Sequence, residues 1–321
     1  MKPIGGFLEF DLPQIGASYH PQALALSTGR SCINYIIQKA QIKTCYIPFY
    51  SCDSVLSAFE LNDVSIKFYE IDAQLEPKIQ PELEEGAYLL YINFFGIKSA
   101  TVARLIEVYG DRLIIDNVHL FFEKGYPNNW SFTSARKYFG VPDGAYVYPP
   151  TGIAAIEDFP KFCPTNIDHL VNRLIGDREL AYQQNVIYEE TLSPTLQKMS
   201  TFSEKMLNTM DYDQVISIRQ ENFQWLHEHL SPYNQLIINV PPRTTCFRYP
   251  FLPPKQMTKG PFYEAQLFIP AFWSDVTART IAGFEWEKHL SKALLPLPID
   301  HRYRIKDLQR LLDFILTQIL D

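Results

Sequence analysis

A carboxylate and an imidazole lie close together near the middle of the sequence, where they could serve acid–base chemistry. Asp116 follows the apolar run at 112–115, and His119 lies three residues later. A carboxylate at the end of a buried strand can form an ion pair with a protonated ring nitrogen. The same position also suits an aspartate that caps the next helix, and an isolated histidine is more often a structural residue. The residues alone leave these alternatives open.

Lys137 is the candidate nucleophile. It lies in the run 131–146, SFTSARKYFGVPDGAY, directly after Arg136. Burial or a neighbouring cation favours the neutral form of a lysine amine, which attacks carbonyl groups. The commoner alternative is an Arg-Lys pair exposed to solvent. The aromatic residues on both sides and the Pro-Asp-Gly turn that follows favour a buried site.

A short turn of small residues, Thr28-Gly29-Arg30-Ser31, opens a helix pattern. Backbone N–H groups at a helix start attract anions, and a hydroxyl and a guanidinium add further donors. We therefore predict a phosphate site at Gly29, Arg30 and Ser31. An ordinary helix cap is the alternative interpretation.

Alternating strand and helix patterns in the first half must position these residues. The strand patterns occupy 44–48, 65–71, 87–94, 112–115, 130–132 and 145–148, and the helix patterns occupy 31–39, 54–61 and 100–109. This order predicts right-handed crossovers and a mostly parallel sheet flanked by helices. Ligands of such α/β sheets bind beyond the carboxyl ends of the strands, which is where the candidate residues are expected.

The second half has a different pattern, with helices followed by a mixture of short elements. The predicted elements are long helices over 167–229 with a break near Ser193-Pro194, short strands at 245–249 and 265–269, and an amphipathic helix at 305–320. We predict a large α/β domain at 1–160, a helical connector at 161–235 and a smaller α+β C-terminal domain at 236–321.

The composition limits the possible partners. The 321 residues are 46% hydrophobic and 20% charged, with a formal net charge of −7 and no long basic run, so we expect no nucleic-acid partner and no anionic membrane surface. No uninterrupted apolar run is long enough to predict a membrane span. The five cysteines are scattered without a C-x-x-C pair, and the first residues do not resemble a signal peptide. We expect a reduced, cytoplasmic protein without a metal site.

In order and spacing, these runs resemble the DegT/DnrJ/StrS family of PLP-dependent sugar aminotransferases, which have the type I aspartate-aminotransferase fold. The family carries a glycine-hydroxyl turn for the phosphate, a Pro-x-x-Thr-aromatic segment, a His-x-Tyr-Gly strand end, an Asp-x-x-Gln run and a Ser-Phe run leading through the lysine to an acidic-Gly-Gly turn. The similar segments here are Thr28-Gly29-Arg30-Ser31, Pro48-Phe49-Tyr50-Ser51-Cys52, Asn93-Phe94-Phe95-Gly96, Asp116-Asn117-Val118-His119 and Ser131-Phe132 through Asp143-Gly144-Ala145. The resemblance covers most of residues 4–150 and returns at 245–321, as in an uncharacterised branch found among polysaccharide-biosynthesis proteins.

The resemblance implies pyridoxal 5′-phosphate as cofactor, a type I fold and a homodimer. It implies transfer of an amino group from an amino acid, glutamate in our hypothesis, to a keto-sugar that is nucleotide-linked, in surface polysaccharide or sugar biosynthesis. Lys137 would form the Schiff base and move the proton, Asp116 would hold the pyridine nitrogen protonated, and His119 would contact the ring oxygen. The other implied cofactor contacts are Gly29, Arg30, Ser31, Ser131 and Arg136, with Cys52 or its neighbour Tyr50 against the ring.

Two departures from the family pattern leave alternatives open. Without a gap the family lysine aligns with Arg136, which stays protonated and cannot form a Schiff base. One inserted residue brings Lys137 into register, and we favour this alignment. The partner-subunit Asn-x-Arg-Met segment has no counterpart around 194–200. The main alternative is therefore a non-catalytic protein of this fold that serves as a sugar- or partner-binding scaffold, and a third is another enzyme on a doubly wound sheet, such as a glycosyltransferase.

Overall fold

The computed structural model describes residues 6–8, 10–13, 16–153, 158–241 and 243–320. Its larger sheet has seven strands, in the order β1-β7-β6-β5-β4-β2-β3. They are β1 (Leu24–Leu26), β2 (Thr44–Pro48), β3 (Ser65–Tyr69), β4 (Ala87–Ile92), β5 (Leu113–Asp116), β6 (Trp130–Ser134) and β7 (Ala145–Tyr148). The strands from β3 to β6 pair in parallel, whereas β7 is antiparallel to both β6 and β1. The predicted mostly parallel sheet is confirmed.

Helices follow the strands of the first half as their patterns predict. They are α1 (Gly29–Ala40), α2 (Asp53–Leu61) and α3 (Ser99–Tyr109), with short 3₁₀ turns η1 (Phe94–Gly96), η2 (Gly110–Arg112) and η3 (Ala135–Lys137). The central strands β5 and β6 are buried at every position, because helices cover both faces of a parallel sheet and leave no polar side. Strand β5 therefore appears in the sequence as a short apolar run, whereas β6 also buries Ser131, Thr133 and Ser134.

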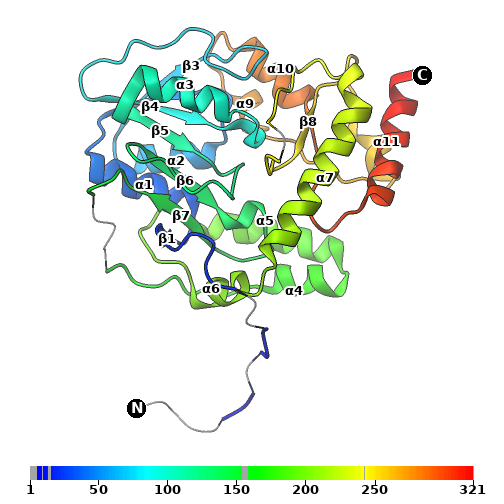
Figure 1. Cartoon of the computed structure of the whole chain (residues 1–321), viewed down its shortest axis with the longest axis horizontal. Helices are drawn as coiled ribbons and strands as arrows, with labels where there is room; N and C mark the ends of the chain where they lie inside the picture. The colour runs from blue at the N-terminus through cyan, green and yellow to red at the C-terminus, as the bar shows by residue number, and fades with distance from the viewer. Residues whose placement is uncertain (1–5, 9, 14–15, 154–157, 242, 321) are drawn as a thin grey trace.

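The second half consists of helices and a small sheet. The helices are α4 (Asp168–Ile175), α5 (Arg178–Thr191), α6 (Thr201–Leu207), α7 (Tyr212–Leu230), η4 (Ser231–Tyr233), α8 (Lys259–Glu264), α9 (Asp275–Ala278), α10 (Glu285–Ala293) and α11 (Ile305–Leu320). The predicted break at Ser193-Pro194 falls between α5 and α6, and the predicted last helix coincides with α11. Figure 1 shows the large sheet on one side of the molecule and α7, α11 and β8 (Tyr249–Phe251) on the other.

Two strand predictions in this half are wrong. The small sheet pairs β8 with β9 (Leu295–Leu297) in antiparallel register, so only Tyr249 of the predicted strand 245–249 is in a strand. The predicted strand 265–269 is an irregular segment after α8, and Gln266 in it has a φ of 56°. The apolar residues there lack a partner strand, and a short apolar run becomes a strand only when its backbone can pair.

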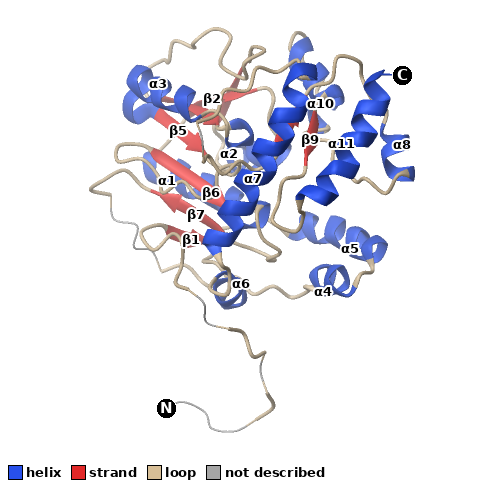
Figure 2. Ribbon diagram, turned by 45° about the vertical axis from the view of Figure 1, so that its right-hand side comes forward, coloured by secondary structure: helices blue, strands red, loops and turns tan. Residues whose placement is uncertain are grey.

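The hydrophobic core continues from one half to the other. One cluster of buried residues contains Ile115 of β5, Leu226 of α7 and Leu297 of β9. Helix α7 also contacts α11 and β8, and Figure 2 shows α7 lying between the two groups of strands. The division into three domains at 160 and 235 remains a prediction. Among the described residues, no helix is both long and apolar enough to cross a membrane.

Candidate active site

A cavity of about 1180 Å³ lies beyond the carboxyl ends of the parallel strands. Ile92, Asp116 and Ser134, the last residues of β4, β5 and β6, line it. The start of α1, helices α4 and α5, and the loop 300–303 near the C-terminus also contribute. The sheet topology therefore brings the first half's candidate residues together, and the second half completes their surroundings.

Asp116 is a buried carboxylate at the end of β5. Its side chain is 2% exposed, and its Oδ1 accepts a hydrogen bond of 2.9 Å from the backbone N–H of Val118. Burial raises the pKa of Asp116 to about 7, although the Val118 N–H and the positive charge of Lys137 act in the opposite direction. A single peptide N–H does not compensate a buried carboxylate, so this group would be stabilised by a cation in the cavity.

His119 is a neutral ring within an aromatic stack. Its Nδ1 accepts a hydrogen bond of 3.1 Å from the backbone N–H of Phe95. Burial lowers the pKa of His119 well below its usual value, and the charges of Lys137 and Arg248 lower it further. A neutral imidazole that accepts at Nδ1 carries its proton at Nε2, so this nitrogen is available as a donor in the cavity wall.

The aromatic stack around His119 includes residues that the sequence did not indicate. The ring centroid of Phe247 lies 4.8 Å from that of His119 at 16° between planes, and the centroid of Trp273 lies 5.8 Å away at 18°. Both aromatic residues line the cavity. Trp273 has a φ of 53°, and its carbonyl accepts a hydrogen bond of 2.7 Å from Ser291 Oγ.

The two basic residues at 136 and 137 have different environments, although both line the cavity. Arg136 forms an ion pair with Glu189 of α5, at 2.5 Å between NH2 and Oε1. Lys137 is exposed to the cavity and has no hydrogen bond or ion pair within the described chain. Its charge nevertheless acts on Asp116, His119 and Cys52. Of the two basic residues, Lys137 is therefore the one without a partner among the described residues.

Glu189 connects Arg136 to the start of α1. Its Oε2 lies 3.9 Å from Arg30 NH2. Burial alone would raise the pKa of Glu189, but the charges of Arg136, Lys137 and Arg30 hold it below its usual range. The carboxylate therefore stays ionised and holds two arginines at one end of the cavity.

The beginning of α1 supplies backbone donors. Thr28 caps the helix by accepting a hydrogen bond of 3.0 Å from the N–H of Ser31, and Thr28, Gly29 and Arg30 line the cavity. Ser31 is completely buried and its hydroxyl donates to the carbonyl of Thr195, so its side chain is directed to the protein interior. Of the predicted phosphate contacts Gly29, Arg30, Ser31 and Ser131, the structure brings Gly29 and Arg30 to the cavity.

Of the other predicted cofactor contacts, some line the cavity and others are buried away from it. Cys52 lines the cavity directly before α2. Tyr50 is fully buried against Phe94 and Trp273, and neither it nor Ser131 is among the described residues that line the cavity. Ser134 lines it instead, because side chains alternate between the faces of a strand and positions 131 and 134 lie on opposite faces of β6.

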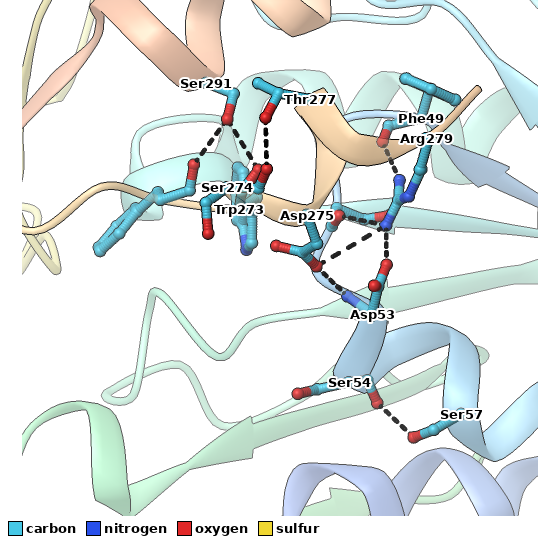
Figure 3. A network of polar contacts seen from close by, with 12 residues as sticks. Phe49, Asp53, Ser54, Ser57, Trp273, Ser274, Asp275, Thr277, Arg279 and Ser291 are labelled. Atoms are coloured by element: carbon cyan, nitrogen blue, oxygen red, sulfur yellow. Dashed lines mark hydrogen bonds and ion pairs between the residues drawn. The ribbon is translucent and has the colours of Figure 1, made fainter. Parts of the chain in front are cut away.

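A polar network attaches the Trp273 segment to the turn before α2. Figure 3 shows Arg279 beside Phe49 and Asp53. The Arg279 guanidinium donates to the carbonyl of Phe49 at 2.5 Å and to that of Ser51 at 2.8 Å, and lies 2.6 Å from Asp53 Oδ1. The C-terminal half thus holds Trp273 over residues that belong to the first half of the chain.

The architecture is similar to that of several solved enzymes. A DegT DnrJ EryC1 StrS aminotransferase from Brucella abortus is 13% identical, with a TM-score of 0.64 over 92% of this chain and 86% of that chain. A sugar aminotransferase from Micromonospora echinospora is 12% identical, with a TM-score of 0.62 over 92% and 87%. The chain has the fold of these aminotransferases.

A third structure with this fold has a different activity. The GDP-4-keto-6-deoxy-D-mannose-3-dehydratase of E. coli, solved with bound hydrated PLP, is 13% identical, with a TM-score of 0.63 over 91% of this chain and 87% of that chain. No family model matches the sequence, and no curated protein matches it. Identities this low support the expected type I fold and leave the chemistry to the site residues.

Proposed function

We propose that the protein is a pyridoxal phosphate-dependent aminotransferase that transfers an amino group from an amino acid to a keto-sugar. The observation that carries this proposal is the separation of the two basic residues. Glu189 engages Arg136, whereas Lys137 lines the cavity without a hydrogen bond or ion pair in the described part of the chain. An unengaged lysine that acts electrostatically on a buried aspartate is the arrangement that this chemistry requires.

The chemistry of the donor set fits the cofactor. The buried carboxylate of Asp116 would pair with the protonated pyridine nitrogen, which would compensate its charge. The backbone N–H groups of Gly29 and Arg30 at the start of the 12-residue helix α1 would hold the phosphate. Val118, Cys52 and Trp273 line the cavity around Asp116 and offer apolar contact to the ring.

The residues of the site would hold the cofactor, keep its ring nitrogen protonated and transfer a proton. When bound, pyridoxal phosphate supplies an electron-withdrawing ring that stabilises negative charge on the substrate carbon. Asp116 would keep the ring nitrogen protonated, and the Nε2–H of His119 would be available to donate a hydrogen bond to the ring oxygen. The amine of Lys137 would hold the cofactor covalently and, once free, would carry the proton as general base and acid.

We infer the substrate class from two lines of support. Structures of this fold include sugar aminotransferases and a dehydratase whose name specifies a GDP-linked keto-sugar. The sequence resemblance supports glutamate as the amino donor and a nucleotide-linked keto-sugar as the acceptor, in surface polysaccharide or sugar biosynthesis in the cytoplasm.

We also propose that the protein is a homodimer. Helices α4 and α5 carry exposed apolar side chains, of which Leu174 is 86%, Ile175 is 71% and Ile187 is 63% exposed. Apolar patches of this kind on adjacent helices commonly mark protein interfaces. Leu174 also lines the cavity, so a second subunit on this surface would lie at the cavity's edge.

Covalent retention of the cofactor tests the proposed function. Wild-type protein incubated with pyridoxal phosphate and reduced with borohydride is expected to carry the cofactor on the peptide that contains Lys137, as read by mass spectrometry. Lys137→Ala should lose this labelling, whereas the control Lys198→Ala, whose lysine pairs with Asp158 outside the cavity, should keep it. If the wild type is not labelled, or Lys137→Ala is labelled equally, the non-catalytic scaffold replaces the proposal.

A further inference from the structure

Two groups of arginines line the cavity. Arg30 and Arg136 share Glu189, as described above. The second group, Arg219, Arg248 and Arg302, comes from α7, the residue before β8 and the loop before α11. The two groups take part in separate sets of charge interactions, the first around Glu189 and the second around Asp300.

Asp300 is the carboxylate around which the second group of arginines lies, and both of its oxygens accept hydrogen bonds from Arg302. Arg302 donates to both carboxylate oxygens, at 2.6 Å from Nε and 3.0 Å from NH2. Burial alone would raise the pKa of Asp300, but the hydrogen bonds and charge of Arg302 and the charges of Arg219 and Arg248 hold it below its usual range. One carboxylate therefore faces three guanidinium groups, which leaves two positive charges in excess.

Arg219 binds the backbone through one of its guanidinium nitrogens, whereas its buried Nε has no hydrogen-bond partner among the described residues. It is 1% exposed, and its NH1 donates to the carbonyls of Cys246 at 3.3 Å and Phe247 at 3.1 Å. Its guanidinium carbon lies 4.3 Å from the centroid of the Tyr138 ring. These contacts hold Arg219 against the backbone segment before β8. There its charge adds to the positive potential of the cavity, and it forms no ion pair with a carboxylate among the described residues.

Arg248 lacks such partners. Its guanidinium carbon lies 5.3 Å from the ring centroid of Phe247, the residue that stacks on His119. Within the described chain it forms no hydrogen bond and no ion pair, and it lines the cavity. Burial lowers the pKa of Arg248 to about 10, the charge of Asp300 acts in the opposite direction, and the charges of Arg219 and Arg302 lower the pKa further. A half-buried guanidinium that lines the cavity with unused donors is placed to pair with an anion.

We propose that Arg248 binds an anionic group of the substrate, a carboxylate or a phosphate, through paired N–H donors. Guanidinium groups bind either oxyanion in a bidentate manner. The proposal deepens the proposed function, on which it rests, because it places the substrate's anion near His119 and away from the Gly29–Arg30 turn proposed for the cofactor phosphate. The carboxylate of an amino-acid donor and the phosphate of a nucleotide-linked sugar are the two sources to distinguish.

Binding calorimetry with two probes distinguishes these sources. Glutarate supplies carboxylates without an amine, and UDP supplies a nucleoside diphosphate without a sugar. Each is titrated into the full-length wild type, Arg248→Gln, Arg248→Lys and the control Arg310→Gln, whose arginine is exposed on α11 outside the cavity. Circular dichroism and melting temperature establish that the variants are folded.

We expect Arg248→Gln to weaken one probe at least about tenfold, as is typical for loss of one partner of a close charge pair. Arg248→Lys should weaken it less, because it keeps the charge but loses the fork, and Arg310→Gln should not change it. An effect on glutarate identifies the carboxylate, and an effect on UDP identifies the phosphate. Failure of both probes to bind the wild type, or equal affinities in the wild type and Arg248→Gln, overturns the proposal.

The calorimetric result is separate from the covalent labelling of Lys137. Arg248-dependent binding without cofactor labelling would keep the oxyanion site and remove the proposed aminotransferase activity. Labelling of Lys137 without Arg248-dependent binding would keep the activity and remove the oxyanion site. The two proposals can therefore fail independently.

Discussion

The buried carboxylate of Asp116 is costly to keep ionised unless a cation in the cavity pairs with it. Its carboxylate is buried with a single peptide N–H as hydrogen-bond partner, and burial raises its pKa to about 7. Near neutral pH the folded protein is therefore a mixture of molecules with a protonated and with an ionised Asp116. A protonated ring nitrogen would shift this balance to the ionised form, because an adjacent positive charge stabilises the carboxylate.

The pH dependence of stability should therefore reveal Asp116. Without cofactor, the folded state retains the Asp116 proton up to about pH 7, whereas the unfolded chain releases it near the usual aspartate pKa of 3.8. The folded state binds more protons between these values, so the free energy of unfolding should fall by about 3 kcal/mol as pH rises from 4 to 7. Urea unfolding of the wild type and Asp116→Asn measures this.

Asp116→Asn should remove that decrease, because an amide does not titrate. The difference between the two proteins isolates Asp116 from other titrating groups. Parallel pH curves for the wild type and Asp116→Asn would show that the Asp116 pKa is not raised. Saturating pyridoxal phosphate should stabilise the wild type more at pH 7 than at pH 5.

The candidate residues could be predicted from sequence where strand ends fix them. Asp116 ends β5, Lys137 ends the turn η3 that follows β6, and both line the cavity. Ser131 could not be placed correctly, because the resemblance fixes its position along β6 but not which face of the strand it occupies. Trp273 and Arg248 had no local signal, since tertiary packing brings their segments to the cavity from the far half of the chain.

Among the elements, the turn η1 depends on a close approach of two backbones. Gly96 has a φ of +78°, and a Cβ added there would overlap the backbone carbonyl oxygen of His119. This contact explains why a glycine follows the strand end at Asn93-Phe94-Phe95. Any side chain at position 96 would displace the backbone of His119 from the cavity wall.

Gly96→Ala should therefore destabilise the protein more than positive φ alone explains. We expect a loss of about 3 kcal/mol in free energy of unfolding, combining left-handed strain with backbone overlap. Gly86→Ala is the matched control, because Gly86 has a φ of +71° and no atom within 4 Å of an added Cβ, and should cost about 1 kcal/mol. Urea unfolding compares the two, and equal losses would contradict the overlap.

The segment that carries Trp273 depends on Arg279. Arg279→Ala removes the donors to the carbonyls of Phe49 and Ser51 and the ion pair with Asp53. We expect a loss of about 2 kcal/mol in stability, discounted because Asp53 is exposed. Trp273 should become more accessible to water, which shifts its fluorescence to longer wavelength.

Two control variants test whether the change in emission comes from Trp273 and depends on Arg279. Arg304→Ala, at an exposed position before α11, should change neither stability nor emission. Arg279→Ala combined with Trp273→Phe should lose the spectral shift and keep the loss of stability. An unchanged emission spectrum in Arg279→Ala would show that Trp273 does not depend on the network.

Most strands of the first half were predictable, because β2, β4 and β5 are short apolar runs and β3 alternates, whereas the three-residue β1 was not predicted. The small sheet was not, for a specific physical reason. Pro250 of β8 pairs directly with Pro296 of β9, and proline cannot donate to a ladder and normally argues against a strand. The strands occur because both are short, with few backbone donors to satisfy.

At the scale of the whole molecule, the proposed homodimer gives a further prediction. Ile187→Asp places a charge within the exposed apolar surface of α4 and α5, and should convert a dimer to monomers in size-exclusion chromatography with light scattering. Ile79→Asp is the control, because Ile79 is also strongly exposed, at 76%, but lies elsewhere. A monomeric wild type, or a dimer that Ile187→Asp leaves intact, would contradict the proposed interface.

The network around Arg279 also has a consequence for the order of events during synthesis. Arg279 and the Phe49 carbonyl that it contacts are 230 positions apart, and the cavity also needs residues up to Tyr303. A nascent chain can assemble much of the large sheet while the ribosome is still translating the helices, since chains fold progressively from the N-terminus. The site itself forms only after nearly the whole polypeptide has left the ribosome. Ribosome-bound fragments that end before Arg279 should therefore have a folded sheet and a cavity that lacks its C-terminal wall.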